Sequence, residues 1–572
     1  MKLSTFIYAY ATATSTSTAS ESASCRCFPG ETCWPSLPAW DSLNATVGGR
    51  LVATIPLGSP CHDPVYNATE CANLQSLWID PQLHMNSSSS VMAPFFANQS
   101  CDPFQPEARS CLLGNYVDYA VNLSTSNAAS EVGAAVGFAH QHNLRFVIRN
   151  TGHDYLGKST GAGALSVWTH HLKDIEFLNW SDEHYNGKAI KMGAGVQGYE
   201  AMAAAQANGL VIVGGECPTV GIAGGYSQGG GHSALSTNFG LGADQTLSWE
   251  VVTAEGKLIT ASRFENPEIY WALSGGGGGT YGVVLSLTSK AHPDNIVGGA
   301  SLTFLSSSTT ADTFYEGVAT FHASLPAIID AGVMVIYFLS NTSFEIFALT
   351  AYGKTSTEVK TILADFLSAL DALNITYAAS YSQSANYVDH YNTYLGPLPF
   401  GNIQVGVAQY GGRLIPRSSI ENNLTAFMAV TRNITENGCM YAGVALNVSS
   451  PAITSGVSNA VLPAWREALV HVILSTPWNF TAPWSEMIAL QDRMTDEYIP
   501  QLEAVTPGSG AYINEADFRQ PNWQDDFFGV NYEKLLAIKN KWDPHHLFYA
   551  TKAVGSEVWT VAEDGRMCKT SE

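Results

Sequence analysis

Two spacings of apolar residues predict helices and strands in the first half of the chain. Between Leu113 and about Pro293, the stretch 127–143 repeats apolar residues at helical spacing, whereas 144–150 and 209–215 are short runs rich in β-branched residues. Clusters of glycine separate these elements. Helices that alternate with strands predict a domain of mixed α and β structure.

A different pattern follows Asp294. Alternating apolar and polar residues over 333–340 and 343–353 predict strands. Two helical patterns interleave with such strands, at 356–373 and 419–434. Together they predict an antiparallel sheet backed by helices.

Another helical pattern lies near the C-terminus, over residues 532–542, and Asp543-Pro544 ends it. A short segment of this kind is expected to pack back against an earlier domain. We find no internal repeat.

The cysteines are crowded near the N-terminus. Seven of the ten lie within the first 111 residues, in a segment rich in Pro, Ser and Asn with little periodicity. This crowding predicts an irregular region held by disulfides and formed in an oxidising compartment.

Two further features predict secretion. Residues 1–20 carry one lysine, a short apolar run and small residues suited to signal-peptide cleavage. Twelve N-x-[ST] sequons are potential glycosylation sites. They begin at Asn44, Asn67, Asn86, Asn98, Asn122, Asn179, Asn341, Asn374, Asn423, Asn433, Asn447 and Asn479. No uninterrupted apolar stretch of about 18 residues is present, so we expect no membrane span.

Net charge narrows the range of partners. The chain has 27 Lys and Arg against 49 Asp and Glu, a formal charge of −22. Nucleic acids and anionic membrane surfaces need clustered cations, so we expect neither as a partner. Because 46% of the residues are hydrophobic and 13% are charged, the chain can bury large cores.

The segment from Gly193 to Gly198 matches G-x-G-x-x-G, the turn of dinucleotide-binding folds. It follows a strand pattern, precedes a helix, and has Glu216 about 20 residues further on. However, no run of βαβ units accompanies it, and the next strand leads into another glycine cluster. We interpret it as a structural glycine-rich turn.

A second short motif, Gly225-Tyr-Ser227-Gln-Gly229, fits the nucleophile elbow G-x-S-x-G. An elbow needs a helix after the serine, but the residues that follow, GGHSALSTNFG, are poor helix formers. We therefore favour a phosphate-binding loop over a hydrolase nucleophile.

Neighbouring histidines suggest metal sites but lack the right spacing. His140 and His142 lie two positions apart in a predicted helix, so they point to different faces. The pairs at 170–171 and 545–546 have no second pair of ligands at a useful distance. We predict no metal site.

Two segments concentrate residues with reactive or binding chemistry. The first, 149–161, reads RNTGHDYLGKSTG and offers small side chains and one histidine. The second, 214–232, has eight glycines in its first eighteen residues. Such glycines let the backbone approach a ligand, and successive N–H groups bind pyrophosphate. The residues alone thus predict a phosphate-bearing cofactor.

In longer motifs the chain resembles the vanillyl-alcohol-oxidase superfamily, and within it the secreted berberine-bridge-enzyme-like FAD-linked oxidases of fungi. The resemblance covers most of the chain from Cys25 to Trp559. It includes CRCFPGETCWP, RNTGHDY, GECPTVGIAGGYSQGGGHS, GLGADQ, ALSGGGGGTYGVV and NYEKLLAIKNKWDPHHLFYATKAVGSEVW.

The resemblance implies an α+β protein with a two-subdomain, PCMH-type FAD-binding domain over 113–293. A signal peptide (1–20) and a Cys-rich cap (21–112) would precede it. The substrate domain, with an antiparallel sheet backed by helices, would span 294–523. A berberine-bridge-like segment, 524–562, would return to the FAD domain.

The same resemblance implies bicovalent FAD, with His153 bonded to the flavin 8α-methyl and Cys217 to flavin C6. An imidazole nitrogen and a thiolate are both competent nucleophiles toward an electron-poor ring. The alternatives are a hydrogen-bonded loop histidine and a buried free thiol or disulfide partner. Further cofactor contacts are implied for Arg149, Asn150, Thr151, Gly152, Asp154, Ser159, Gly214, Gly215, Val220, Gly221, Gly224, Gly225, Gly229, Gly230, His232, Gly240, Asp244, Val283, Asn514 and Asn531.

In such enzymes a base takes a proton from the substrate as hydride passes to flavin N5. Tyr512, in the Y-x-N motif, is our candidate for this base, with a core tyrosine as the alternative. Tyr391, Tyr394 and Tyr410 are further candidates that the sequence does not rank. Val220, three residues past Cys217, matches the position that gates oxygen in plant relatives, where valine accompanies oxidase behaviour.

These features predict a secreted, monomeric oxidase whose partners are a small-molecule substrate and O2. It would oxidise an alcohol, a sugar or a secondary metabolite and release H2O2. Two alternatives stay open. The first is a dehydrogenase or oxidative cyclase of secondary metabolism, and the second is a secreted flavin- or glycan-binding protein with vestigial activity.

If Cys217 holds flavin, nine cysteines remain, and nine cannot all pair within one chain. At least one thiol should then be free. Cys439 and Cys568 are the least clustered and are the candidates.

Overall fold

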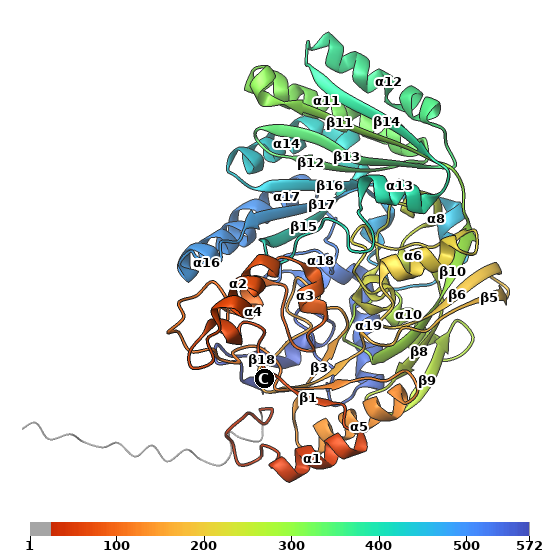
Figure 1. The fold of residues 1–572 in the computed structure, drawn as a ribbon. Helices are drawn as coiled ribbons and strands as arrows, with labels where there is room; N and C mark the ends of the chain where they lie inside the picture. Colours follow the sequence, from red (N-terminus) through yellow and green to blue (C-terminus); the bar gives the residue numbers. More distant parts are fainter. Residues whose placement is uncertain (1–24, 571–572) are drawn as a thin grey trace, which may run out of the picture.

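The computed structural model describes residues 25–570, so the predicted signal peptide at 1–20 lies outside the described residues. The fold is α+β, as predicted, with three large sheets and a two-stranded ribbon among these residues (Figure 1). The third sheet and its helices occupy the upper half of Figure 1, and the first two sheets lie below it.

The first sheet has the order β1-β2-β4-β3. Its strands are β1 (Leu51–Ala53), β2 (Tyr119–Asn122), β4 (Ala164–Trp168) and β3 (Arg145–Arg149). Strand β4 runs parallel to β2 and β3, whereas β1 is antiparallel to β2. Helix α5 (Ala128–Gln141) buries its apolar side in the same core as this sheet. Helix and strand lie where the spacing predicts them, and the loop that begins RNTGHDY leaves the end of β3.

The second sheet has the order β5-β6-β10-β8-β9, and β7 also pairs with β10. Its strands are β5 (Ile175–Ser181), β6 (Asn186–Gly193), β10 (Val283–Pro293), β8 (Thr246–Val252), β9 (Leu258–Ser262) and β7 (Leu210–Val211). All pairings are antiparallel.

The G-x-G-x-x-G segment joins β6 to helix α6 (Gly198–Gln206) inside this second sheet. Because both neighbours of β6 run antiparallel to it, the unit is not the parallel βαβ of a dinucleotide-binding domain. A Cβ at Gly195 would collide with the carbonyl oxygen of His170. Close backbone contact therefore explains the glycine, in agreement with the structural interpretation.

The third sheet is a seven-stranded antiparallel sheet of order β14-β11-β13-β12-β16-β17-β15. Its strands are β11 (Val297–Leu305), β12 (Met334–Leu339), β13 (Ser343–Tyr352), β14 (Tyr377–Ser384), β15 (Ala408–Pro416), β16 (Met440–Ala445) and β17 (Ala468–Pro477). Helices α11 (Ala311–Asp330), α12 (Ser356–Ala372) and α14 (Arg417–Glu436) share the core on one face of the sheet. This is the predicted sheet backed by helices.

Alternate residues of β12 face different surroundings, as the period of two requires. Val335, Tyr337 and Leu339 lie in the core shared with the helices. Ile336 and Phe338 lie on the opposite face and line a cavity. That inner face is therefore available to a ligand.

Helix α11 is the one long helix on this sheet that the spacing analysis did not identify. Its buried Phe314, Val318, Phe321 and Leu325 follow helical spacing. Pro326 lies inside the helix and disguises the pattern. The side chain of Thr310 caps its N-terminus by accepting a hydrogen bond from the Thr313 N–H.

The N-terminal region contains four short helices, α1 (Leu37–Thr46), α2 (Ala68–Leu77), α3 (Pro81–Met85) and α4 (Pro94–Ala97). Three disulfides hold it, Cys27–Cys33, Cys61–Cys71 and Cys101–Cys111. The prediction of a disulfide-held region is confirmed.

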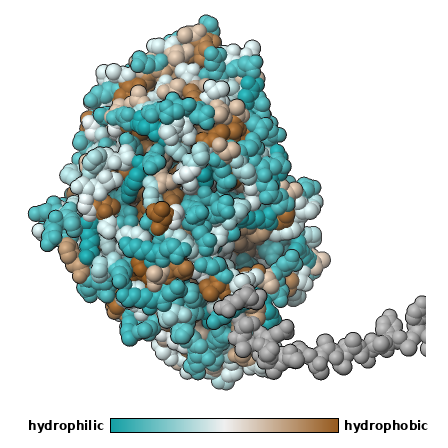
Figure 2. All heavy atoms as spheres, turned by 180° about the vertical axis from the view of Figure 1, so that it is seen from behind, coloured by the Kyte–Doolittle hydropathy of each residue, from teal (hydrophilic) through white to brown (hydrophobic). Residues whose placement is uncertain are grey.

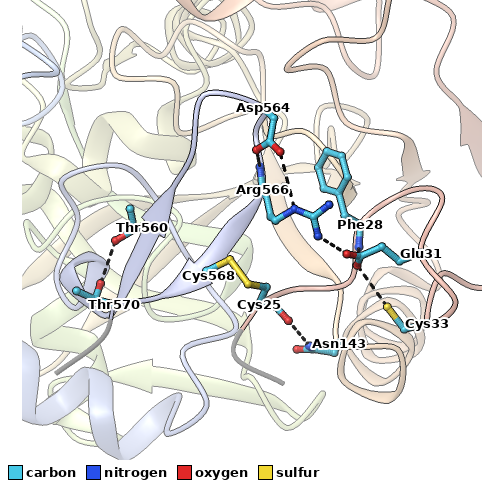
Figure 3. Close-up of a disulfide and its surroundings, with 10 residues drawn as sticks. All are labelled: Cys25, Phe28, Glu31, Cys33, Asn143, Thr560, Asp564, Arg566, Cys568 and Thr570. Atoms are coloured by element: carbon cyan, nitrogen blue, oxygen red, sulfur yellow. Dashed lines mark hydrogen bonds and ion pairs between the residues drawn. A yellow bond between two sulfur atoms is a disulfide. The ribbon is translucent and has the colours of Figure 1, made fainter. Parts of the chain in front are cut away.

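A fourth disulfide, Cys25–Cys568, joins the N-terminal region to β19 (Met567–Lys569) (Figure 3). Around it, Arg566 pairs with Glu31, and the Asn143 side-chain amide donates to the Cys25 carbonyl at 2.8 Å. Of the two candidate free thiols, Cys568 is thus paired. Cys439 and Cys217 are the free cysteines among residues 25–570.

The C-terminal helix α19 (Tyr532–Trp542) matches the predicted range and packs back against an earlier part of the chain. The fully buried ammonium group of Lys539 donates to Asp543 Oδ2 at 2.6 Å. It also donates to the carbonyl oxygens of Thr280 and Phe548, each at 2.7 Å. This helix therefore holds the glycine-rich stretch that contains Thr280.

Within residues 25–570, no helix is long and apolar enough to cross a membrane. Seen from behind, the surface is mostly hydrophilic, and apolar residues form small scattered groups (Figure 2). A large apolar patch of the kind that marks an interaction surface is absent from that view.

Candidate active site

A cavity of about 320 Å³ lies between the glycine-rich loops and the inner face of the third sheet. Its walls come from the segments 148–159, 215–228 and 278–284, from strands β12, β16 and β17, and from residues 512–515. Most of the predicted site residues line it. They are Asn150, Thr151, Gly152, His153, Asp154, Ser159, Gly215, Cys217, Val220, Gly221, Gly224, Gly225, His232, Tyr512 and Asn514.

A second hollow, of about 520 Å³, opens beside the N-terminus of α5. It is lined by surface groups such as Asn127, Lys191 and Glu250. None of the predicted site residues lies there. The chemistry predicted from the sequence therefore converges on the smaller cavity.

His153 and Cys217 meet through a third residue, Thr219. The Thr219 hydroxyl lies 2.8 Å from Nε2 of His153 and 3.3 Å from Sγ of Cys217. Thr219 is fully buried, and both of its partners face the cavity. A single hydroxyl therefore sets the orientation of both predicted flavin anchors.

Burial sets the protonation of these two anchors. It lowers the pKa of His153 to about 3, with His84 and Arg149 adding to the effect, so the imidazole is neutral and keeps a free lone pair. Burial raises the pKa of the Cys217 thiol, while hydrogen bonds from Thr219 and Val220 work against that rise. The Cys217 thiol is thus more buried and less acidic than the glycines around it in the sequence would suggest.

Four ionisable side chains form a cluster at one end of the cavity. His232 lies between two carboxylates, with Nδ1 at 3.0 Å from Glu216 and Nε2 at 2.9 Å from Glu515. His471, in the middle of β17, places its Nε2 at 2.9 Å from the same Glu515 oxygen, Oε2. These residues come from three distant parts of the chain.

The charges in this cluster follow from its geometry. Burial alone would lower the pKa of His232, but Glu216 and Glu515 raise it well above its usual value. Burial would raise the pKa of Glu515, but His232 and His471 lower it far below the usual range. Burial also lowers the pKa of His471. The cluster therefore holds a protonated His232 between two carboxylates, beside a neutral His471.

Ligand atoms of His232, His471 and Glu515 lie within 4.8 Å of one another, close enough to hold a metal ion. However, both histidines already contact the carboxylate at hydrogen-bond distance, 2.9 Å. We interpret the group as a hydrogen-bond network.

Tyr512 and Asn514, the first and last residues of the Y-x-N segment, lie beside this cluster. The Tyr512 hydroxyl accepts hydrogen bonds from the Gly231 N–H at 3.0 Å and from the Asn514 side-chain amide at 2.6 Å. The same amide also donates to the Gly225 carbonyl at 2.9 Å. Asn514 thus ties this segment to the second glycine loop.

The cavity walls fit a flavin nucleotide. Asn150 Oδ1 and Gln228 Oε1 are buried acceptors at the cavity that lack a partner among the described residues, and ring N–H or ribityl hydroxyl groups would supply one. A Cβ at Gly225 would meet nothing within 4 Å, so the backbone there is open to a ligand. Thr151 and Ser159 add hydroxyl groups to the same wall.

Nine predicted site residues lie outside the cavity wall. They are Arg149, Gly214, Gly229, Gly230, Gly240, Asp244, Val283, Tyr391 and Asn531. Most of them are buried and do not face the cavity.

Asp244 lies away from the cavity wall and bonds within the protein. Its carboxylate pairs with both terminal nitrogens of Arg466, at 2.6 and 2.9 Å. It also caps helix α9 (Gly242–Gln245) by accepting from the Leu241 N–H at 2.9 Å. With both oxygens engaged, Asp244 has a structural role.

Tyr391, a predicted catalytic candidate, also lies off the cavity wall. It is fully buried, and its hydroxyl donates to the carbonyl oxygens of Glu216 at 2.8 Å and Gly215 at 3.2 Å. It therefore supports the loop that carries Cys217 from behind. Tyr394 hydrogen-bonds Ser382 at 2.8 Å and likewise lies off the cavity wall, whereas Tyr410 lines it.

Arg149 and Asn531 also bond away from the cavity. A terminal nitrogen of Arg149 donates to the His84 carbonyl at 3.0 Å and so ties β3 to the N-terminal region. The Asn531 amide donates to the carbonyls of Ala460 and Val461, at 3.3 and 3.2 Å.

Three residues of the site, Thr219, Glu515 and His471, have no role that sequence motifs predict. Glu515 directly follows the Y-x-N motif, and this position was a signal in the sequence that could have identified it. His471 interrupts an apolar strand, LVHVIL, and a buried polar residue of that kind indicates a specific partner. Their meeting with His232 depends on contacts across more than 200 residues, which local patterns do not encode.

Comparison with known proteins agrees with this site. Residues 125–262 match the FAD binding domain family, and residues 511–555 match the berberine and berberine like family. The FAD-linked oxidoreductase ZEB1 of Gibberella zeae is 57% identical over 547 residues, which cover 96% of this chain and 95% of that protein. The bifunctional decalin synthase calF of Penicillium decumbens is 42% identical, over 95% of each chain.

Among solved structures, the VAO-type flavoprotein MtVAO615 from Myceliophthora thermophila C1 superposes with a TM-score of 0.92. It shares 42% identity and covers 96% of this chain and all of that one. The chain therefore belongs to the FAD-linked oxidoreductases of the vanillyl-alcohol-oxidase type with a berberine-like C-terminal segment. It is an oxidoreductase that uses FAD and acts on a small molecule.

Proposed function

We propose that this protein is an oxidase in which FAD is bonded to both His153 and Cys217. The substrate would be an alcohol, a sugar or a secondary metabolite, and O2 would be reduced to H2O2. The observation that carries the proposal is the joint contact of both side chains with Thr219 at the cavity wall.

Bound FAD would supply the hydride acceptor and would pass the electrons on to O2. The chain's own part is positional. The neutral His153 and the Cys217 thiol face the same cavity, and Asn514 keeps Tyr512 and the glycine loop in register. Val220 lines the cavity three residues past Cys217, the position that the family resemblance assigns to the control of oxygen access.

We also propose secretion and glycosylation. Four disulfides agree with an oxidising compartment. Nine of the twelve sequon asparagines are exposed, and the other three, Asn44, Asn122 and Asn447, are partly buried. Glycosylation requires accessible side chains, so most of these sites are suitable. The domain limits given above remain part of this proposal.

The test of the flavin linkage is acid precipitation of the purified protein. Yellow colour that stays with the pellet supports covalent flavin, and a colourless pellet rejects it. His153→Ala and Cys217→Ala should each keep colour through the other bond, whereas the double variant should lose it. Peptide mass spectrometry then identifies each attachment.

The test of the reaction is oxygen consumption with peroxide detection, across a panel of alcohols, aldoses and amines. Flavin reduction by a substrate without oxygen consumption would favour another electron acceptor. No reduction by any compound would favour a binding protein.

A second candidate is an oxidative cyclase of secondary metabolism. The similarity to the decalin synthase calF favours it. A cyclase would convert its substrate to a product with the same number of carbon atoms and a new ring. Detection of such a product by mass spectrometry distinguishes a cyclase from an enzyme that only oxidises an alcohol.

A further inference from the structure

The proposed function leaves open which group accepts the substrate proton. The charged cluster at the end of the cavity contains two carboxyl groups, those of Glu216 and Glu515. They differ in access, because the side chain of Glu515 is 23% exposed and that of Glu216 is 12% exposed. Both line the cavity.

Glu515 has one carboxylate oxygen held in place and one free. Its Oε2 accepts from His232 and from His471, each at 2.9 Å. Among the described residues, no donor contacts the other oxygen, Oε1. Two donors on one oxygen fix the orientation of the carboxylate, which keeps Oε1 in place for a proton from a ligand.

Tyr512 is less suited to this role than the sequence indicates. Its hydroxyl already accepts two hydrogen bonds, from Gly231 and Asn514. A phenol that accepts twice has no lone pair left for a third proton. Burial and the charges of Glu515 and Glu216 also raise its pKa well above 10, so a phenolate is disfavoured.

Besides Tyr512 and Cys217, three tyrosines that remain protonated line this cavity. They are Tyr155, Tyr226 and Tyr410, and burial, together with the nearby carboxylates, raises the pKa of each, to about 12 for Tyr410. Tyr155 and Tyr410 stack at 4.0 Å between ring centroids. Glu515 is thus the more accessible of the two carboxyl groups at this end.

Strands β12, β16 and β17 of the third sheet supply an apolar part of the wall, and β15 adds Tyr410. Ile336 and Phe338 of β12, Ala442 and Val444 of β16, and Ile473 of β17 line it. These side chains offer no hydrogen bonds, whereas recognition of a sugar requires several polar partners. The wall therefore suits a ligand with an apolar body and one polar end.

We propose that Glu515 is the catalytic base for an alcohol with an apolar body, whose hydroxyl group lies at Oε1 while its carbon skeleton lies against the third sheet. This proposal rests on the proposed function. His232 and His471 act as positioning residues for the carboxylate.

The step balances. The alcohol O–H bond breaks and its proton bonds to Glu515 Oε1, while the O–H electron pair becomes the second bond of the carbonyl. The carbon would lose hydride, with its electron pair, and bound FAD would supply the acceptor for it. Overall, alcohol plus O2 would give carbonyl plus H2O2, with O2 taking up the two electrons and two protons.

The experiment compares Glu515→Gln with Tyr512→Phe and with Glu497→Gln, an exposed glutamate in the same domain. Each holoenzyme is mixed anaerobically with benzylic or aliphatic alcohols, and flavin reduction is followed by absorbance. We expect Glu515→Gln to lose about 10²–10⁴-fold in rate, the usual size of a base effect. We expect Glu497→Gln to match the parent, and Tyr512→Phe to stay within about tenfold of it.

Two measurements distinguish a catalytic base from a residue that only maintains the structure of the site. In Glu515→Ala, formate should restore part of the rate, because the vacated space admits a small carboxylate. Covalent flavin content, measured in the acid pellet, should be unchanged in all variants. If Glu515→Gln does not fold, Glu515→Asp tests the same role, and its carboxylate should retain partial activity.

Several results would overturn the proposal. They are a Glu515→Gln rate within about threefold of the parent, a larger loss in Tyr512→Phe than in Glu515→Gln, or turnover of aldoses only. A parent protein with no bound flavin would instead reject the proposed function. The effect of Glu515→Gln on unfolding against pH, described below, needs no flavin and remains measurable in that case.

Discussion

The hydroxyl of Thr219 lies 2.8 Å from Nε2 of His153, although 66 positions separate the two residues in the chain. This contact occupies one ring nitrogen and leaves Nδ1 for the proposed bond to the flavin. Because the same hydroxyl reaches Cys217, one short side chain aligns both anchors.

Thr219→Val should therefore reduce bicovalent attachment. Valine keeps the shape of threonine but removes the hydroxyl, so His153 and Cys217 lose their common partner. We expect a larger fraction of protein with flavin on one residue only, measured by mass spectrometry of the flavin peptides. Thr219→Ser is the control and should retain both bonds. Equal attachment in Thr219→Val would show that the hydroxyl has no such role.

The charged cluster should make stability depend on pH in a defined window. His232 has a folded pKa above its usual 6.5, so its stabilisation is complete below that value and is lost as pH rises toward the folded pKa. Glu515 has a folded pKa below its usual 4.5, so its contribution is complete above that value and is lost as pH falls.

The difference in unfolding temperature between the parent and Glu515→Gln should thus be largest between pH 4.5 and 6.5 and smaller on either side. Thermal unfolding at a series of pH values measures it. A difference that stays constant with pH would contradict the assigned charges.

Lys539 should be essential to the attachment of the C-terminal helix. Lys539→Met leaves Asp543 as a buried charge without its partner, and we expect a loss of about 3–5 kcal/mol in the free energy of unfolding. Lys541, two positions along the same helix, is exposed and pairs with Glu268. Lys541→Met should therefore cost no more than about 1 kcal/mol. Denaturant unfolding of the two variants gives the comparison.

The contact between Asp244 and Arg466 offers a test of whether Asp244 binds the cofactor. Arg466→Met removes the bidentate partner of a buried carboxylate, and we expect a loss of roughly 2–4 kcal/mol because Arg466 is partly exposed. Flavin content per folded protein should stay at the parent level, since neither residue lines the cavity. A selective loss of flavin at unchanged stability would return Asp244 to the cofactor site.

Elements with regular spacing were predictable from the sequence. Helices α5, α12, α14 and α19 lie within a few residues of the predicted ranges, because their apolar faces repeat without interruption. Helix α11 was not predicted, because Pro326 interrupts the helical spacing of its sequence. The third sheet nevertheless packs against this helix. Tertiary packing there overrides local preference.

The loop residues of the candidate site were predictable from their motifs, but the roles of their neighbours were not. His153, Cys217 and Tyr512 all line one cavity, as expected. Asp244 and Tyr391 lie in or near equally suggestive segments, yet their side chains turn toward Arg466 and toward the loop carbonyls. The direction of a side chain depends on partners far away in sequence, which a motif does not contain.

The Cys25–Cys568 bond closes nearly the whole described chain into a covalent ring. A protease that cuts one exposed loop inside this ring opens it but releases no fragment. The nicked protein would migrate as a single species until a reductant is added, and its third sheet would remain tethered to the flavin-binding loops at both ends. A single cut in the backbone would thus leave the protein held together as one molecule.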